Sequence, residues 1–139
     1  MKIGFTGTQD GMTTAQREAL MSIFDQIREP SELHHGDCIG SDAEAHSTAA
    51  AFGIKRVCHP PDSPTKRAFC KCEVTLPEKP YLARNHDIVD ATDMLIATPK
   101  SDQEELRSGT WATIRYARKL KRAIYIIQPN GVIKTENLT

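Results

Sequence analysis

Three glycine-containing segments of the chain hold the residue types that could bind a phosphate group. They comprise residues 6–11, 34–42 and 107–111, and in each of them small or polar side chains flank a glycine. Glycine allows a backbone to approach an anion closely, and N–H groups at the start of a helix favour negative charge. Each segment alone also fits an ordinary turn or helix cap. Together they predict one binding site that contains Gly7, Thr8, Gly36, Asp37, Gly40, Ser41, Asp42, Ser108, Gly109 and Thr110.

The segments that would position these residues alternate between strands and helices. The hydrophobic pattern predicts strands at residues 2–8, 32–36, 54–59, 94–97 and 123–127. Helices are expected from residue 13 to about 28, at 41–52, from 80 through 89, and at 109–119. This alternation is typical of a Rossmann-like α/β/α fold with three layers and a central, mostly parallel sheet of about five strands. A ligand of such a sheet binds outside the carboxyl ends of its strands.

Local signals set the expected ends of the helices. Thr13 with Gln16, and Ser41 with Glu44, have the spacing of a capping box. Gly53 is expected to stop the second helix. The third helix should begin at Pro80 and pack through an apolar stripe of Tyr81, Leu82, Ile88 and Val89.

Two stretches are expected to be less regular. Residues 61–79 are rich in proline, lysine and serine, and we expect a loop or flap over the site, because long loops in compact domains are usually functional or disordered. Asn130 and Gly131 form a hairpin-type turn, which predicts a C-terminal hairpin or tail at residues 129–139.

Length and charge limit the classes of function. A chain of 139 residues fits one domain spanning residues 1–139, and its formal net charge is zero. Proteins that bind nucleic acid or membrane surfaces usually carry an excess of Lys and Arg, so we expect neither partner. Because the chain begins directly with a strand, we expect no signal peptide and a cytoplasmic location, where the four cysteines would be reduced thiols.

Several motifs resemble the SLOG superfamily, which includes the LOG phosphoribohydrolases and the DprA-like domains. Residues 107–114 resemble the Gly-Gly-x-Gly-Thr-x-x-Glu segment of the LOG enzymes. Residues 35–42 and 80–89 look like small stand-alone SLOG proteins, many of them carried by phages. The resemblance covers residues 2–128 and implies a nucleotide-binding domain that forms a homodimer or larger homo-oligomer. It adds Arg84, Asn85, Arg107 and Trp111 to the expected ligand site.

The departures from the LOG pattern concern catalysis. The position of the family's glutamate is Thr113, residues 107–108 replace a glycine pair, and Asn85 stands where the enzymes have a lysine after the arginine that Arg84 resembles. Hydrolysis of an N-glycosidic bond requires a carboxylate to activate water or to stabilise the oxocarbenium ion. We therefore assign no catalytic residue; Arg84 and Asp37, or else Asp42 or Asp87, are the candidates if the protein is an enzyme.

Single residues within the site have alternative interpretations. Arg84 and Arg107 could each bind a phosphate or be solvated surface charges. Asp37 could hold a ribose hydroxyl or cap a helix. Trp111 could stack on a base, but its place on the helix favours packing.

The cysteines and histidines raise further questions. Cys58, His59, Cys70 and Cys72 could bind zinc, but a Cys-x-Cys pair is tighter than the usual spacing, so we expect thiols and no metal. Cys38 lies near an expected helix start, which would lower its pKa and make it a conceivable nucleophile. Two adjacent histidines, at positions 34 and 35, alternate on a strand, so only one should face the core or the site.

The leading expectation is a non-catalytic protein, without a cofactor, that senses or sequesters a phosphorylated nucleotide. A nucleotide-derived signal of the ADP-ribose or cyclic-nucleotide type would fit as well. The phage resemblance implies an anti-defence protein acting in the host cytoplasm. The alternative is a LOG-like N-glycosidase of nucleoside 5′-monophosphates, and a weaker third option is a single-stranded DNA binder of the DprA kind.

Overall fold

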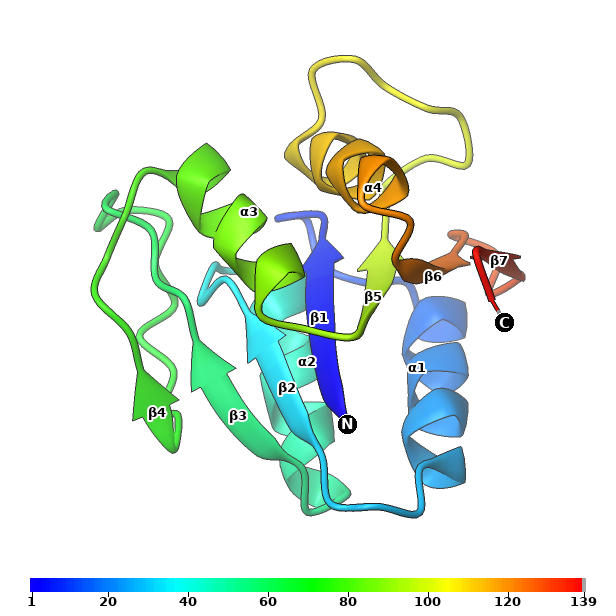
Figure 1. The fold of residues 1–139 in the computed structure, drawn as a ribbon, viewed down its shortest axis with the longest axis horizontal. Helices are drawn as coiled ribbons and strands as arrows, with labels where there is room; N and C mark the ends of the chain where they lie inside the picture. The colour runs from blue at the N-terminus through cyan, green and yellow to red at the C-terminus, as the bar shows by residue number, and fades with distance from the viewer. Residues whose placement is uncertain (139) are drawn as a thin grey trace.

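The computed structural model describes residues 1–138, in which four helices cover the two faces of one seven-stranded sheet (Figure 1). The strand order is β4-β3-β2-β1-β5-β6-β7. The six parallel strands are β1 (Lys2–Gly7), β2 (Glu32–His35), β3 (Lys55–Cys58), β4 (Val74–Thr75), β5 (Met94–Thr98) and β6 (Ala123–Ile127). The last strand, β7 (Ile133–Glu136), pairs antiparallel with β6. The predicted Rossmann-like α/β architecture is confirmed.

The sheet is wider than the five strands expected. One additional strand, β4, comes from the segment expected to be a loop, where two residues pair with the edge of β3. The other, β7, is the return of the C-terminal hairpin, whose turn is closed by a hydrogen bond from Gly131 N–H to the Gln128 carbonyl of 2.7 Å. Of the expected tail, Thr139 lies outside the described residues.

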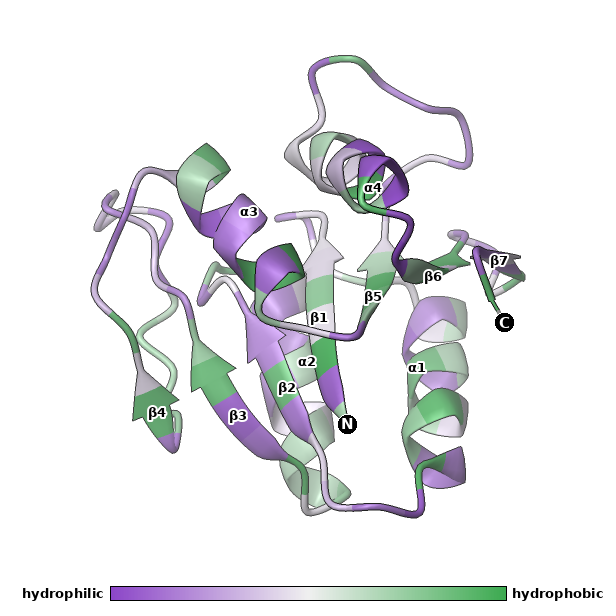
Figure 2. Ribbon diagram, in the orientation of Figure 1, coloured by the Kyte–Doolittle hydropathy of each residue, from purple (hydrophilic) through white to green (hydrophobic). Residues whose placement is uncertain are grey.

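Two helices cover each face of the sheet. On one face α1 (Thr14–Gln26) and α2 (Ser41–Ala51) enclose a core that includes Phe5, Leu20 and Phe24. On the other face α3 (Tyr81–Asp90) and α4 (Gly109–Lys119) pack over a core that includes Leu95 and Ile114. Figure 2 shows hydrophobic residues along β5 and β6 and a mostly hydrophilic loop between β5 and α4. Both faces of the central strands are therefore covered, whereas the edge strands β4 and β7 are largely exposed, and the upper edge of the sheet in Figure 1 carries the exposed loops.

The order of the strands reverses between β1 and β5. The chain proceeds from β1 outward through β2, β3 and β4, and then returns to place β5 on the other side of β1. The loops that follow β1 and β5 therefore separate toward opposite faces of the sheet. This reversal leaves a crevice at the carboxyl ends of the strands, which is where open α/β sheets bind their ligands.

The predicted capping box at the start of α1 is confirmed. Gln16 N–H donates to Thr13 Oγ1, and Thr13 N–H donates to Gln16 Oε1, each over 3.0 Å. The buried amide of Gln16 also donates to the carbonyls of Pro99 and Ile127, each at 2.9 Å. This side chain thereby joins the start of α1 to the segments that follow β5 and β6.

The second predicted capping box is wrong. The N-cap of α2 is Gly40, and no side chain caps the helix. Ser41 lies inside the helix and donates through Oγ to the Thr8 carbonyl over 2.6 Å, while Glu44 accepts the Met12 N–H over 2.6 Å. The loop after β1 crosses the start of α2. Its backbone forms hydrogen bonds with the side chains of Ser41 and Glu44, so these two residues cannot form the capping box with each other.

The predictions for α3 are correct in part. Ile88 and Val89 are buried, but Tyr81 and Leu82 are exposed, because the first turn of α3 extends beyond the sheet. Pro80 is the N-cap of this helix and not a residue of its first turn. No helix within residues 1–138 has both the length and the hydrophobicity that a membrane span requires.

Thr13→Ala should lower the free energy of unfolding by about 1 kcal/mol, because an N-cap hydroxyl satisfies a helix N–H that has no other partner. The measurement is urea denaturation of the wild type and the variant. Thr14→Ala, one position into the helix and equally exposed, is the matched control and should change stability by less than about 0.5 kcal/mol. Equal losses in both variants would contradict the capping role.

Candidate functional site

A cavity of about 500 Å³ opens at the carboxyl edge of the sheet. Its wall is formed by the loops that follow β1 and β2, by the segment that begins at Pro61, by the start of α3 and by the loop that leads into α4. The cavity thus lies in the crevice created by the reversal of strand order. The predicted site residues on its wall are Gly7, Thr8, Gly36, Asp42, Arg84, Asn85, Arg107, Ser108, Gly109 and Thr110.

Two predicted site residues lie behind the wall and have structural contacts instead. Asp37 is completely buried, and its carboxylate accepts hydrogen bonds from Arg67 Nε (3.0 Å) and from Cys70 N–H (2.8 Å). Gly40 adopts a φ of +87° and packs so closely on the backbone of Gln9 that any Cβ there would collide. Asp37 therefore neither caps α2 nor has a free oxygen directed at the cavity.

Ser41 and Trp111 also lie away from the wall. Ser41 is buried, and its hydroxyl donates a hydrogen bond to the Thr8 carbonyl. Trp111 belongs to α4, is 5% exposed and packs in the core between the sheet and the two helices α3 and α4. Packing is thus the role in which the structure places Trp111, as the sequence favoured.

The N-terminus of α4 forms one side of the cavity. Ser108 is its N-cap and accepts the Trp111 N–H over 3.2 Å. The amides of Gly109 and Thr110 lie in the first turn, where a helix supplies no carbonyl partner, and both residues line the cavity. A Cβ added at Gly109 would lie 3.6 Å from Tyr81 Cε2, an ordinary contact distance. This helix end combines the positive end of the dipole with an exposed arginine, Arg107.

The position of the missing glutamate does not face the cavity. Thr113 is 2% exposed and donates through Oγ1 to the Gly109 carbonyl over 2.9 Å. It is not among the residues that line the cavity.

Arg84 forms the floor of the cavity and is not a solvated surface charge. The side chain is 5% exposed, and Nη1 donates to the carbonyls of Gly36 and of His59, the latter over 3.1 Å. Nη2 lies 3.5 Å from Cys38 Sγ, and Nε is buried without a partner among the described residues. The guanidinium therefore joins α3 to the ends of β2 and β3.

Asp42 places a carboxyl group beside this arginine. Its Oδ2 accepts the Cys38 N–H over 3.3 Å. Burial raises the pKa of Asp42 to about 6, although the charge of Arg84 acts in the opposite direction. The carboxyl group of Asp42 thus titrates near neutral pH at the wall of the cavity.

The interpretation of Cys38 as an activated nucleophile is wrong. Cys38 lines the cavity, but burial raises the pKa of its thiol above the usual value, and the nearby carboxylate of Asp42 raises it further. A thiol with a raised pKa is protonated at neutral pH and is a poor nucleophile.

Both adjacent histidines are buried, contrary to the prediction that only one would face inward. His34 Nδ1 lies 2.8 Å from His59 Nε2, and His35 Nε2 lies 3.0 Å from His46 Nδ1. The two side chains point to opposite faces of β2, and each face of the sheet is covered at this place. Burial lowers the pKa of His35 to about 3 and that of His59 to about 4.

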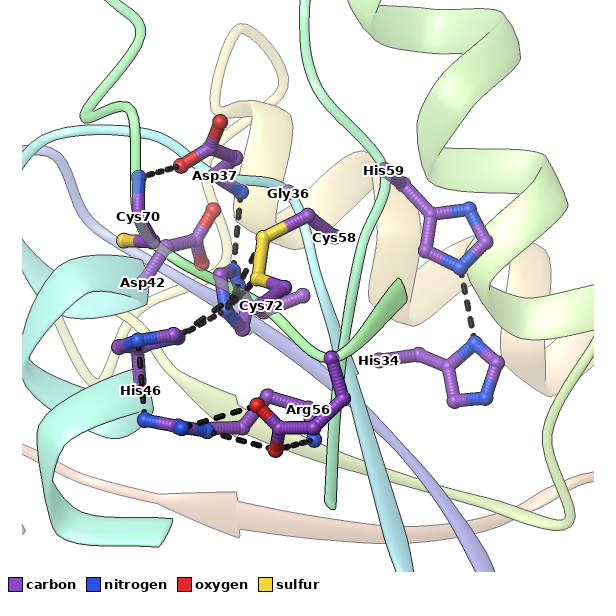
Figure 3. The surroundings of a disulfide bond; sticks show 12 residues. His34, Gly36, Asp37, Asp42, His46, Arg56, Cys58, His59, Cys70 and Cys72 are labelled. Carbon is purple, nitrogen blue, oxygen red and sulfur yellow. Dashed lines mark hydrogen bonds and ion pairs between the residues drawn. A yellow bond between two sulfur atoms is a disulfide. The ribbon is translucent and has the colours of Figure 1, made fainter. Parts of the chain in front are cut away.

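The expectation of four reduced thiols is also wrong for one pair. Cys58 and Cys72 form a disulfide with a Cα–Cα distance of 5.9 Å, whereas Cys38 and Cys70 are free (Figure 3). The reason is that the segment before β4 returns alongside β3, which the sequence spacing does not reveal.

The cavity wall contains eight charged residues, of which only Asp42, Arg84 and Arg107 were among the predicted site residues. Four basic side chains (Lys66, Arg84, Lys100 and Arg107) and four acidic ones (Asp10, Asp42, Asp62 and Glu105) line it. Lys100 pairs with Asp10 over 3.0 Å. Most of the residues that the sequence analysis missed lie in the segment 61–79 and in the polar loop 99–106. The sequence signal that could have identified them is the position of the polar loop directly before the third glycine segment.

No protein-family model matches this sequence, and no curated protein does. Solved structures do match it. The molybdenum cofactor binding protein of Rippkaea orientalis is 19% identical with a TM-score of 0.73, and the match covers 91% of this chain and 76% of that one. DNA processing protein A from Streptococcus pneumoniae is 17% identical with a TM-score of 0.68, over 90% of this chain and 49% of that one.

A third match is DNA processing protein A from Helicobacter pylori, described for its single-stranded DNA binding mode. It is 15% identical with a TM-score of 0.61, over 91% of this chain and 64% of that one. This chain thus spans about half to two thirds of the two DNA processing proteins. All three likenesses show a shared Rossmann-like fold, which agrees with the fold that the sequence resemblance implies.

Asp42→Asn should change how stability depends on pH. A carboxyl group whose pKa is raised from 3.8 to about 6 by folding stabilises the protein fully below pH 3.8, and this contribution disappears as the pH rises through 6. Relative to Asp42→Asn, wild-type stability should fall by about 2–3 kcal/mol between pH 4 and pH 7.5. Denaturant unfolding at several pH values measures the difference, and the buried histidines cancel because both proteins contain them. Parallel curves would show that Asp42 is not the group that titrates.

Proposed function

We propose that the protein binds a phosphorylated nucleotide, or a signal derived from one, in the cavity at the carboxyl edge of the sheet, and that it does not convert it. The observation that carries this proposal is the N-terminus of α4, which opens into the cavity with Gly109, Thr110 and Arg107 on the wall. First-turn amides and a guanidinium are the donors that bind a phosphate group.

The size and charge of the cavity support a small ligand. A volume of about 500 Å³ lies in the range of small-molecule sites. Basic and acidic side chains on the wall balance, which suits a ligand that has a few charged oxygens and a larger neutral part. A nucleic acid would favour a basic stripe, so we propose no nucleic-acid partner, although two fold neighbours are DNA processing proteins.

Binding without conversion is supported by the structural hydrogen bonds of two side chains, Thr113 and Asp37, at positions where a catalytic group was considered. Thr113 bonds to its own helix, and the carboxylate of Asp37 is engaged by Arg67 and Cys70. A domain of this kind can act by sensing or sequestering its ligand. ADP-ribose-type and cyclic-nucleotide messengers are the ligands that we propose, in a phage anti-defence role.

We also propose that the protein forms a homo-oligomer through α3. Tyr81 and Leu82 are 53% and 50% exposed on its first turn, and Tyr81 lines the cavity. A second subunit docked there would cover both side chains and narrow the cavity mouth.

A nucleotide ligand should stabilise the wild type by about 2.7 kcal/mol at a ligand concentration of 100 Kd. Thermal-shift titration with AMP, ADP-ribose and cyclic nucleotides measures this effect. Arg107→Ala should weaken binding at least tenfold because it removes a donor at the phosphate position. Lys119→Ala, an exposed cation at the opposite end of α4, is the control and should bind like the wild type. Equal weakening in both variants, or no shift with any nucleotide, would contradict the proposed site.

Asp42 is the observation that favours a second candidate, the LOG-like N-glycosidase. Its carboxyl group lines the cavity, and its raised pKa of about 6 suits a general acid. If the non-catalytic proposal is correct, incubation with AMP should release no free adenine by chromatography beyond a buffer control. Release that is lost in Asp42→Asn, with AMP binding retained, would establish the enzyme instead.

A further inference from the structure

Four side chains outside the cavity converge on a single point. They are His35 at the end of β2, His46 on α2, Cys58 at the end of β3 and Cys72 in the segment before β4, and each offers a ligand atom within 4.8 Å of the other three. The sequence also suggested Cys58 and Cys72, but it grouped them with His59 and Cys70 in place of the two histidines. Figure 3 shows His59 paired with His34, away from the sulfur atoms, and Cys70 beside Asp37.

The distances among these atoms fit a tetrahedral metal site. The sulfur–nitrogen separations are 3.8 Å from Cys58 to His35 Nε2, and 3.7 Å from Cys72 to both His35 Nε2 and His46 Nδ1. The two nitrogens lie 3.0 Å apart. With ordinary zinc–nitrogen and zinc–sulfur bonds, the ligand atoms of a tetrahedral site lie about 3.3–3.8 Å from one another. The two nitrogens must separate slightly and the sulfur pair must separate further, and the Cα–Cα distance of 5.9 Å between the cysteines leaves room for this.

The surroundings fix which nitrogen of each ring faces the sulfur atoms, and zinc binding would move each ring proton to the outer nitrogen, where it would displace the N–H group that now donates there. Asp37 N–H lies 3.0 Å from His35 Nδ1, so Nε2 of that ring faces the sulfur atoms. Arg56 Nη1 lies 3.0 Å from His46 Nε2, so Nδ1 of that ring faces them as well, and Arg56 is itself fixed by its ion pair with Glu73. A disulfide alone would not require two imidazole rings directed at its sulfur atoms.

We propose that the reduced protein binds one Zn²⁺ through His35 Nε2, His46 Nδ1 and the thiolates of Cys58 and Cys72. The two thiols release their protons to solvent on binding, and the two thiolate charges balance the charge of the ion. Two sulfur and two imidazole donors in a closed tetrahedral set are typical of a structural zinc site.

The ion would fasten the flap to the sheet. Cys72 is the only one of the four ligands on the segment 61–79, and the same segment contributes Pro61, Ser63 and Lys66 to the cavity wall. Directly after Cys72 the segment pairs with β3 through the two residues of β4. Zinc at Cys72 would therefore hold the far end of the flap while its near end closes the cavity.

The test is the metal content of the full chain, purified with a thiol reductant and without chelator or added metal. Plasma mass spectrometry should find one zinc per chain. Replacement by Co²⁺ should give the visible d–d bands of a tetrahedral site and the near-ultraviolet charge-transfer band of cobalt–thiolate bonds. Removing the zinc with a chelator under reducing conditions should lower the melting temperature, and Zn²⁺, but not Mg²⁺, should restore it.

Cys72→Ser should lose most of the zinc, whereas Cys70→Ser, two positions away on the same segment and outside the cluster, should retain it. The wild-type cobalt spectrum keeps the test decisive if Cys72→Ser does not fold. The proposal is overturned if the reduced wild type contains no zinc and takes up no Co²⁺, or if its intact mass shows that Cys58 and Cys72 stay joined in reductant. Equal loss of zinc from the two variants would overturn it as well. None of these results depends on a nucleotide, so they are independent of the function proposed for the cavity.

Discussion

The buried guanidinium of Arg84 connects the parts of the molecule that meet at the carboxyl edge of the sheet. It belongs to α3, donates to backbone carbonyls that follow β2 and β3, and forms the floor of the cavity. A buried cation is costly unless hydrogen bonds and a nearby negative charge compensate it. Gly36 leaves the space for this arrangement, because a Cβ there would collide with the guanidinium and would lie 2.8 Å from Asp42 Oδ2. The shape of the cavity follows from how this charge is accommodated, and the charge opposes the rise in the pKa of Asp42 that burial causes.

Two glycines on the wall of the cavity differ in how closely the surrounding atoms approach them. Gly7 ends β1, and a Cβ there would collide with Thr98 Oγ1 and Ser41 Cβ. Gly109 begins α4, where a Cβ would make only an ordinary contact with Tyr81 Cε2 and would collide with nothing. The first glycine is thus required by packing between β1, β5 and α2. The second is not required by the fold, and the open space beside it is the space that we assign to a phosphate group.

Features set by local chemistry could be predicted from the sequence. The limits of α4 and the capping box at Thr13 depend on residues within one turn of each other, and they were predicted correctly. The capping box at Ser41 failed because Thr8, more than thirty positions away, accepts its hydroxyl. The predicted site residues also fall into two groups, those that line the cavity and those that pack behind its wall. Gly7 and Gly109 line one cavity, but Gly40 lies behind Gln9, since the crossing of the β1 loop over α2 has no local signature.

The cysteines and histidines show the same limit more clearly. Cys58 and Cys72 were grouped with His59 because those residues are close in sequence, yet β3 and β2 are neighbours in the sheet. This pairing places His35 next to Cys58, whereas His59 turns to the other face. Which histidine shares a face with a cysteine depends on strand order and register, and neither can be derived from the spacing along the chain.

The central claim is that the free amides at the start of α4 bind the phosphate group of a nucleotide. Amide chemical shifts of uniformly ¹⁵N-labelled protein, followed during titration with AMP and ADP-ribose, test it most directly. We predict large downfield changes at Gly109 and Thr110, smaller changes at Gly7 and Gly36, and none at Gly53 and Gly131, which lie outside the cavity. Saturable binding that leaves the amides of Gly109 and Thr110 unchanged, or the absence of any change with either nucleotide, would contradict the claim.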